Sequence, residues 1–115
     1  MIVDDDVEFG RFVKRALSGM GHIVEEIPSP REFMRRYDKL RPDVIFLDIF
    51  MPELNGVEVT KWLAEKCFNG KLVLMTGRDP SVMTAAQRIA EERSGAEVAT
   101  LEKPFRVSEV RELLN

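Results

Sequence analysis

The sequence predicts an α/β fold in which five parallel strands form a doubly wound sheet with helices on both faces. Short apolar runs alternate five times with segments whose apolar residues recur at helical spacing. The run Val44–Leu47 is continuously apolar, which is typical of a strand that is covered on both faces. Parallel neighbours need a crossover connection, so this alternation indicates successive βα units rather than hairpins.

The first two strand–helix units are predicted from short segments. Residues 2–3 form the first strand, and residues 7–20 follow at helical spacing until Gly21 ends the helix. Residues 23–27 are expected to form the second strand. The tetrapeptide Ser29-Pro30-Arg31-Glu32 then predicts the start of a helix that runs to about residue 40, because serine caps helices and proline suits their first position.

The remaining units have clearer boundaries. The third strand spans residues 44–47, and Gly56 opens a helix that is expected to include Cys67. Residues 71–75 form the fourth strand, and Asp79-Pro80 predicts a capped start of a long fourth helix. The apolar stripe of that helix comprises Val82, Ala85, Ala86, Ile89 and Ala90, and it is followed by a fifth strand at residues 97–101 and a last helix at residues 107–114.

Composition indicates one soluble domain that covers residues 1–115. Hydrophobic residues make up 44% of the chain and charged residues 32%, which is typical of a globular protein. No apolar run approaches the roughly 18 residues that a membrane span requires, and the start does not resemble a secretory signal. Cys67 is the single cysteine, so a reducing, cytoplasmic setting is expected. The net charge of −3 argues against direct nucleic-acid binding by this domain.

Polar side chains stand at four strand ends. Asp4, Asp5 and Asp6 follow the first strand, Asp48 follows the third, Thr76 the fourth and Lys103 the fifth. The carboxyl ends of parallel strands lie at one edge of the sheet, where ligands bind. Carboxylates gathered with a hydroxyl and an ammonium predict a site for a divalent cation and a phosphoryl group.

Each of these residues also has a structural interpretation. The three aspartates are suited to cap the first helix, Thr76 to form a turn before Gly77, and Lys103 to be a solvated charge. Asp48 is the hardest to explain in this way, because it ends the most apolar strand and no helix follows for several residues. The functional interpretation therefore depends on the convergence of all four strand ends.

Four motifs in this order resemble the receiver domain of two-component response regulators, and the resemblance covers essentially the whole chain. They are Val3-Asp4-Asp5-Asp6, the segment FLDIFMPELNG at residues 46–56, Leu74-Met75-Thr76-Gly77, and Glu102-Lys103-Pro104-Phe105. The resemblance implies a flavodoxin-like (βα)5 fold with the strand order 2-1-3-4-5. It also implies a signalling domain rather than an enzyme, with self-catalysed phosphotransfer and slow dephosphorylation as its chemistry. It also implies a histidine kinase or histidine phosphotransfer protein as partner.

The resemblance assigns roles to the metal-binding residues. Asp48 and Asp5 would ligate Mg²⁺ directly, and the backbone carbonyl of Phe50 would be the third protein ligand. Asp4 would act chiefly through coordinated water. Magnesium prefers hard oxygen ligands and keeps several waters, so this donor set leaves positions for a phosphoryl oxygen.

The resemblance also assigns the phosphoryl-binding residues. Asp48 would be the phosphoacceptor, and Thr76 would bind a phosphoryl oxygen. Lys103, ahead of an expected cis bond to Pro104, would pair with the phosphorylated aspartate. The sequence departs from the family at Thr100, which stands where receivers carry a switching aromatic residue, so rotation of a large ring is excluded as the signal here.

The interval from Thr76 to Lys103 is longer than in many receivers, and the surplus is expected to extend the fourth helix. This interval is similar to that of receivers which precede cyclic-di-GMP phosphodiesterase (EAL) domains. A C-terminal effector domain outside this sequence, trimming before the very short first strand, and a homodimer through the fourth and fifth helices are further expectations.

Two alternatives stay open from the residues. A haloacid-dehalogenase-like phosphohydrolase also uses an aspartate, a Thr-Gly strand end, a lysine and magnesium. Its nucleophile motif would place Glu8 where that family has threonine or valine, and it would leave Asp48 without a role. A degenerate receiver that acts only in docking or dimerisation is the second alternative, and the presence of Asp48, Thr76 and Lys103 argues against it.

Overall fold

Five parallel strands form one sheet in the order β2-β1-β3-β4-β5 in the computed structural model, which describes residues 1–51, 53–77 and 80–114. This confirms the predicted doubly wound fold and strand order. The strands are β1 (Ile2–Val3), β2 (Glu26–Ile27), β3 (Val44–Asp48), β4 (Lys71–Thr76) and β5 (Glu97–Glu102). The helices are α1 (Val7–Gly19), α2 (Pro30–Leu40), α3 (Gly56–Glu65), α4 (Pro80–Arg93) and α5 (Val107–Leu114).

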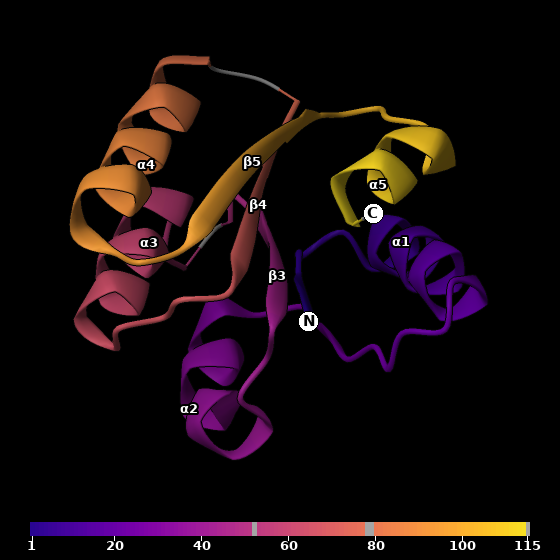
Figure 1. Cartoon of the computed structure of the whole chain (residues 1–115), viewed down its shortest axis with the longest axis horizontal. Helices are drawn as coiled ribbons and strands as arrows, with labels where there is room; N and C mark the ends of the chain where they lie inside the picture. Colours follow the sequence, from indigo (N-terminus) through magenta and orange to yellow (C-terminus); the bar gives the residue numbers. More distant parts are fainter. Residues whose placement is uncertain (52, 78–79, 115) are drawn as a thin grey trace.

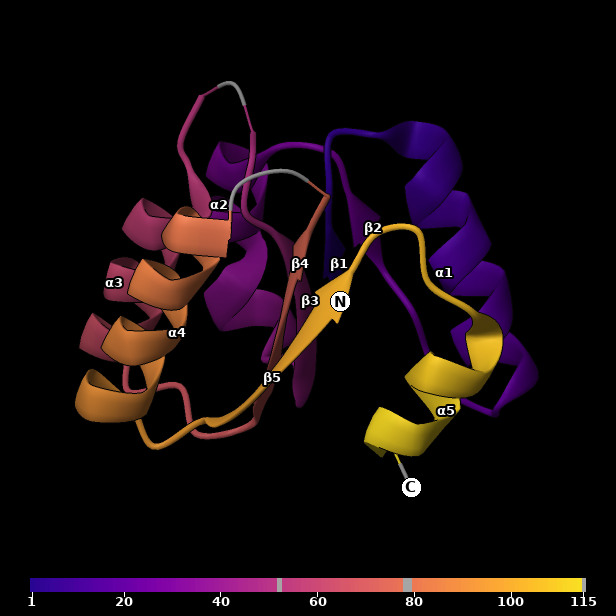
Figure 2. The same ribbon diagram turned by 90° about the horizontal axis from the view of Figure 1, so that it is seen from above.

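The helices cover both faces of the sheet (Figures 1 and 2). Helices α1 and α5 pack on one face, and α2, α3 and α4 lie on the other. Alternate residues of β3 point into the two cores. Ile45 and Leu47 belong to the cluster under α2, α3 and α4, while Phe46 belongs to the cluster under α1 and α5. Burial on both faces explains why β3 is continuously apolar.

Side-chain caps fix the starts of three helices. Asp6 accepts a hydrogen bond from the Phe9 amide at the start of α1, and Ser29 accepts one from the Glu32 amide at the start of α2. Asn55 caps α3 in the same way through the amide of Glu58. The predicted start of α2 is therefore confirmed, with Pro30 at its first position. The predicted cap at Asp79 lies outside the described residues.

The predicted second strand was too long. The structure begins β2 at Glu26, and Ile23 is 99% exposed. The pairing explains the difference, because the two residues of β1 align with Glu26 and Ile27 only. Residues 23–24 therefore lie ahead of the ladder, and their apolar character does not make them strand residues.

The predicted third helix also extended too far. Helix α3 ends at Glu65, and Cys67 lies beyond it, exposed and with a φ of 59°. The left-handed turn at Cys67 brings Phe68 back toward the helix, where the Phe68 amide donates to the Leu63 carbonyl and its ring is buried. The helix therefore ends where the aromatic ring turns into the core, although the apolar spacing of the sequence continues to Cys67. Across the described parts of the chain, none of the helices is sufficiently long and apolar to span a membrane.

We predict that Gly56→Ala destabilises the fold by about 1–3 kcal/mol, because its new Cβ would lie 2.7 Å from the Cα of buried Ile49. The Gly56 amide donates to the Ile49 carbonyl at 2.7 Å, so the loop between β3 and α3 has little room to move aside. Urea unfolding measures the change. Gly19→Ala is the control, since a Cβ there meets no atom within 4 Å. Equal unfolding midpoints for Gly56→Ala and the unmodified chain would contradict the prediction.

Candidate functional site

The polar residues predicted at the strand ends lie on one edge of the sheet. Asp4 directly follows β1, Asp48 ends β3, Thr76 ends β4 and Lys103 directly follows β5. The parallel register brings these ends together, because Asp48 aligns with Met75 and Thr76 aligns with Glu102.

Three carboxylates form the negative part of this site. Oxygen atoms from Asp4, Asp5 and Asp48 all lie within 4.8 Å of one another. Asp4 and Asp48 are buried, whereas Asp5 is exposed at the mouth of the cluster. The amide of Asp6 donates to Asp4 Oδ1 at 2.9 Å and fixes its orientation. Hard oxygen donors at this spacing fit a divalent cation such as Mg²⁺.

Lys103 supplies the positive charge. Its Nζ lies 2.7 Å from Asp4 Oδ2 and 3.7 Å from Asp48 Oδ1. The Lys103 amide donates to the Thr76 carbonyl at 2.7 Å, which ties the residue to the end of β4. The Lys103–Pro104 peptide bond is cis, as the resemblance to receiver domains implied.

Asp5 and Asp48 open onto a pocket of about 680 Å³. The lining residues are Asp5, Asp6, Asp48, Phe50, Met51, Gly77 and Lys103. The Phe50 amide donates to Asp48 Oδ1 at 3.4 Å, so Phe50 reaches the site through its backbone. Thr76 is buried at the end of β4 and is not in this lining, where its neighbour Gly77 stands instead.

The sequence interpretation missed two neighbours of the site. Met51 lines the pocket, and the ring of Phe9 lies beside the Lys103 ammonium, with 4.2 Å between Nζ and the ring centroid. Helical spacing placed Phe9 in the core stripe of the first helix. The contact between residues 94 positions apart depends on how α1 packs beside the end of β5, and no local pattern encodes it.

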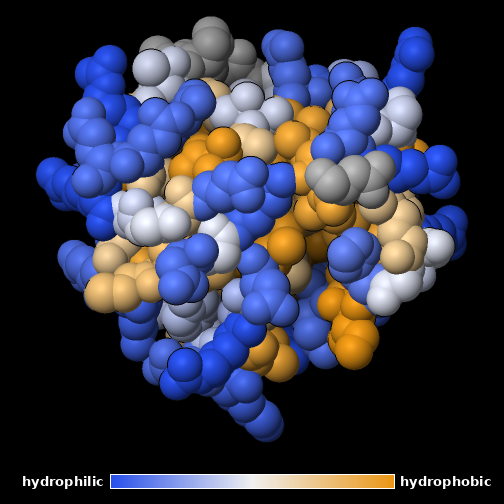
Figure 3. Space-filling model, in the orientation of Figure 1, coloured by the Kyte–Doolittle hydropathy of each residue, from blue (hydrophilic) through white to orange (hydrophobic). Residues whose placement is uncertain are grey.

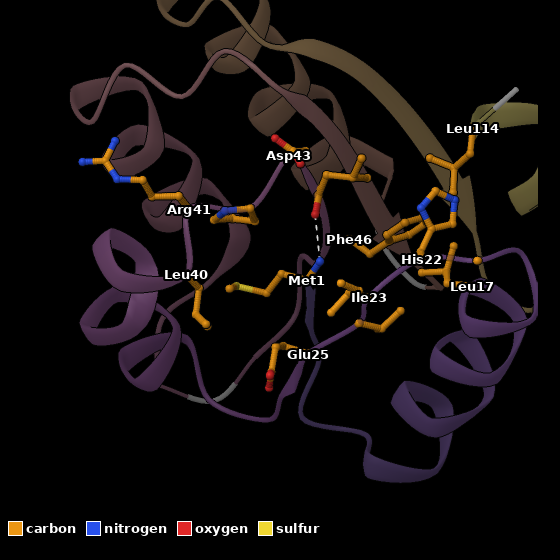
Figure 4. A pocket seen from close by; sticks show the side chains of 14 residues that line it. Met1, Leu17, His22, Ile23, Glu25, Leu40, Arg41, Asp43, Phe46 and Leu114 are labelled. Carbon is orange, nitrogen blue, oxygen red and sulfur yellow. Dashed lines mark hydrogen bonds between the residues drawn. The ribbon is translucent and has the colours of Figure 1, made fainter.

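A second pocket, of about 480 Å³, lies at the opposite, amino edge of the sheet and contains none of the predicted site residues. Its lining includes Met1, Leu17, Ile23, Phe46 and Leu114 (Figure 4), and the Met1 amino group donates to the Val44 carbonyl there. Figure 3 shows apolar residues in the centre of this face, between hydrophilic side chains.

Burial raises the pKa of Asp48 to about 7, and the negative charge of Asp4 contributes to the same shift. Lys103 and the Phe50 amide act in the opposite direction, because both stabilise the ionised carboxylate. Because the Asp48 carboxylate is poorly solvated, its ionised form destabilises the folded state when no metal ion is bound. The site is thus arranged for an additional positive charge.

This pKa predicts the pH dependence of the metal-free protein. The folded state holds the Asp48 proton up to about pH 7 and the unfolded state releases it near pH 4, so stability should fall between these values. Asp48→Asn cannot lose a proton. We expect its free energy of unfolding to exceed that of the unmodified chain by an amount that grows across this range. The difference should level off at about 2–4 kcal/mol above pH 7.

Urea unfolding from pH 4 to pH 8 with a chelator measures this difference. Glu112→Gln, which removes an exposed carboxylate on α5, controls for the loss of one negative charge. A constant difference between Asp48→Asn and the unmodified chain would show that the pKa is not raised.

Curated proteins of similar sequence include a chemotaxis protein and a transcriptional regulatory protein. The chain is 30% identical to the chemotaxis protein CheY of Thermotoga maritima over 116 residues, which covers 100% of this chain and 92% of CheY. It is 34% identical over 110 residues to the transcriptional regulatory protein TrcR of Mycobacterium tuberculosis, covering 96% of this chain and 41% of TrcR. The chain thus spans less than half the length of TrcR.

Solved structures and a family model give the same assignment. The crystal structure of chemotaxis protein CheY4 from Vibrio cholerae matches with a TM-score of 0.83 and 26% identity, over 98% of this chain and 92% of CheY4. The receiver domain of NtrX from Brucella abortus has the same fold, with a TM-score of 0.85 at 22% identity over 98% of this chain and 92% of that one. The model of the response regulator receiver domain matches residues 1–115. This chain belongs to the family of response regulator receiver domains.

Proposed function

We propose that Asp48 of this receiver domain accepts a phosphoryl group from a phosphohistidine and that the domain then signals by a change of conformation. The position of its carboxylate carries the proposal. Asp48 is buried at the end of β3, lies within 4.8 Å of Asp4 and Asp5, and still lines an open pocket. Lys103 Nζ lies 3.7 Å from Asp48 Oδ1.

The reaction needs few chemical groups from the protein. An Asp48 oxygen forms a bond to phosphorus while the bond between phosphorus and the histidine nitrogen breaks, and the imidazole takes up a proton as it leaves. Positioning and charge neutralisation are the main requirements of such a transfer. Lys103 neutralises part of the charge on the carboxylates before transfer, and pairs with the phosphorylated aspartate afterwards.

Asp5 and Asp48 would hold Mg²⁺ directly, together with the Phe50 carbonyl, and Asp4 would act chiefly through water. The three convergent carboxylates support this assignment. When bound, the ion supplies positive charge that offsets the repulsion between an anionic carboxylate and an anionic phosphoryl group. Thr76 is proposed to bind a phosphoryl oxygen, because it ends β4 at the same edge of the sheet.

The signal must use a different element from the usual aromatic switch. Thr100 lies in β5, pairs with Leu74 of β4 and is exposed. A threonine side chain is too small to transmit a movement of Thr76 as a rotating ring would. Phosphorylation adds negative charge at Asp48, and this charge shifts a conformational equilibrium only if another element distinguishes the two states.

The partners follow from the same proposal. A histidine kinase or histidine phosphotransfer protein would donate the phosphoryl group in the cytoplasm. An effector domain C-terminal to this chain is in line with the greater length of TrcR. A homodimer through α4 and α5 is proposed as one output. With a net charge of −3, this domain is not proposed to bind nucleic acid itself.

We predict that a small phosphodonor such as acetyl phosphate labels the chain stably in the presence of Mg²⁺ and that Asp48→Asn abolishes the label. Intact-protein mass spectrometry measures the added phosphoryl group. Asp43→Asn removes an exposed aspartate beside β3 and is the control, which should be labelled normally. Labelling that is lost only in Asp4→Asn, together with phosphate turnover, would favour the phosphohydrolase, and no labelling of any variant would favour a degenerate receiver.

Binding of Mg²⁺ should stabilise the folded domain, because the unfolded chain has no assembled carboxylate cluster. At a concentration 100 times the dissociation constant, we expect a gain of about 2.7 kcal/mol. Thermal unfolding with increasing magnesium measures it, and Asp5→Asn should shift the response to higher concentrations. Glu8→Gln removes a nearby carboxylate of α1 outside the cluster and should respond like the unmodified chain.

A further inference from the structure

The Lys103 ammonium contacts an aromatic ring as well as the two aspartates. Its Nζ lies 4.2 Å from the centroid of the Phe9 ring, 2.7 Å from Asp4 and 3.7 Å from Asp48. A cation over a ring face within about 6 Å is attracted by the negative charge of the π system. The ring and the carboxylates therefore hold the ammonium from different directions.

The Phe9 ring is itself held by its neighbours. Its amide donates to the capping carboxylate of Asp6 at 3.1 Å, which fixes the first turn of α1. The ring also meets Phe105 edge-on, with 5.1 Å between centroids and an angle of 89° between their planes. Phe105 is 7% exposed and lies two residues after Lys103. Phe9 thus has both a fixed backbone and a buried partner from the segment that carries the lysine.

The distances indicate what the ring does. The bond from Lys103 to Asp4 has the length of a strong charge-assisted hydrogen bond, whereas 3.7 Å to Asp48 is too long for one. Asp4 alone would direct the ammonium toward itself, and water would compete for its remaining donors. The Phe9 ring attracts the Lys103 ammonium but has no hydrogen-bond acceptor, so it does not compete with Asp48 for the ammonium's N–H donors.

We propose that Phe9 is a positioning residue, which keeps the Lys103 ammonium within reach of Asp48 and limits its hydration. This inference rests on the proposed function, in which Lys103 pairs with phosphorylated Asp48. Leucine would fill similar space but has no π system. Phe9→Leu therefore removes the ring's electrostatic attraction for the ammonium and keeps most of its packing. It also gives α1 a direct contact with the lysine, although the two residues are far apart in sequence.

Phe9→Leu tests the contact in the metal-free protein. Protons held over a ring face are shielded, so the Lys103 Hε resonances should lie upfield in the NMR spectrum of the unmodified chain. Phe9→Leu should move them to the ordinary lysine position, and Phe9→Tyr should restore them. Tyr37→Leu is the control, because Tyr37 is an aromatic residue of α2 that packs on the other face of the sheet. Ordinary Hε shifts in the unmodified chain would overturn the proposal.

The second measurement is the initial rate of labelling by acetyl phosphate with magnesium, at a temperature where every variant is folded. We expect Phe9→Leu to lower it about two- to fivefold, the range that corresponds to a cation–π contact at an exposed site. Phe9→Tyr should recover the rate and Tyr37→Leu should not change it.

An unchanged rate in Phe9→Leu, with normal labelling of the unmodified chain, would overturn the positioning role and leave the proposed function standing. Failure of the unmodified chain to be labelled would instead refute the proposed function, and with it the role of Phe9 that depends on it.

Discussion

Electrostatic repulsion between neighbouring carboxylates at the end of a buried sheet is the constraint on which the site depends. Asp4, Asp5 and Asp48 bring carboxylate oxygens within 4.8 Å of one another. Two unit charges about 5 Å apart repel by about 3 kcal/mol at an effective dielectric of about 20. Lys103 offsets part of this repulsion. Burial, together with the negative charge of Asp4, raises the pKa of Asp48. A site with this unbalanced charge favours binding of another cation.

The rest of the fold holds these groups in place. The two cores pack against opposite faces of the sheet and leave the strand ends little freedom. The Gly56 amide closes the loop after Asp48 by donating to the Ile49 carbonyl. The Lys103 amide is tied to the Thr76 carbonyl in a similar way. Backbone hydrogen bonds beside Asp48 and Lys103 therefore hold these two side chains at fixed positions relative to the sheet.

Helix α1 contributes to the site in two ways. Its cap, Asp6, also lines the pocket, and its first turn carries the ring that lies beside Lys103. The cap follows Asp4 and Asp5 directly, so the same acidic run starts the helix and supplies the carboxylates. The structural and functional interpretations of these aspartates are thus compatible. Asp6 acts mainly as a cap, while Asp4 is buried in the cluster.

The errors in the sequence interpretation have physical causes. Ile23 lies in an apolar stretch of sequence that is typical of a strand, but it is 99% exposed, because β1 pairs only with Glu26 and Ile27. Cys67 continues the apolar spacing of α3, yet the burial of Phe68 requires a left-handed residue there. In both places a long-range contact overrode a local pattern. Such contacts do not appear in the periodicity of a short window.

The sequence by itself determined the class of the fold, the order of its elements and the strand ends that carry acid, hydroxyl and amine groups. Periodicity and turn residues are local properties, and parallel pairing leaves few topologies to choose from. Only the tertiary structure decided which aspartates are buried together, that Gly77 rather than Thr76 lines the pocket, and that Phe9 meets Lys103. These features depend on the packing of side chains from distant segments, and the spacing of residues along the chain does not encode it.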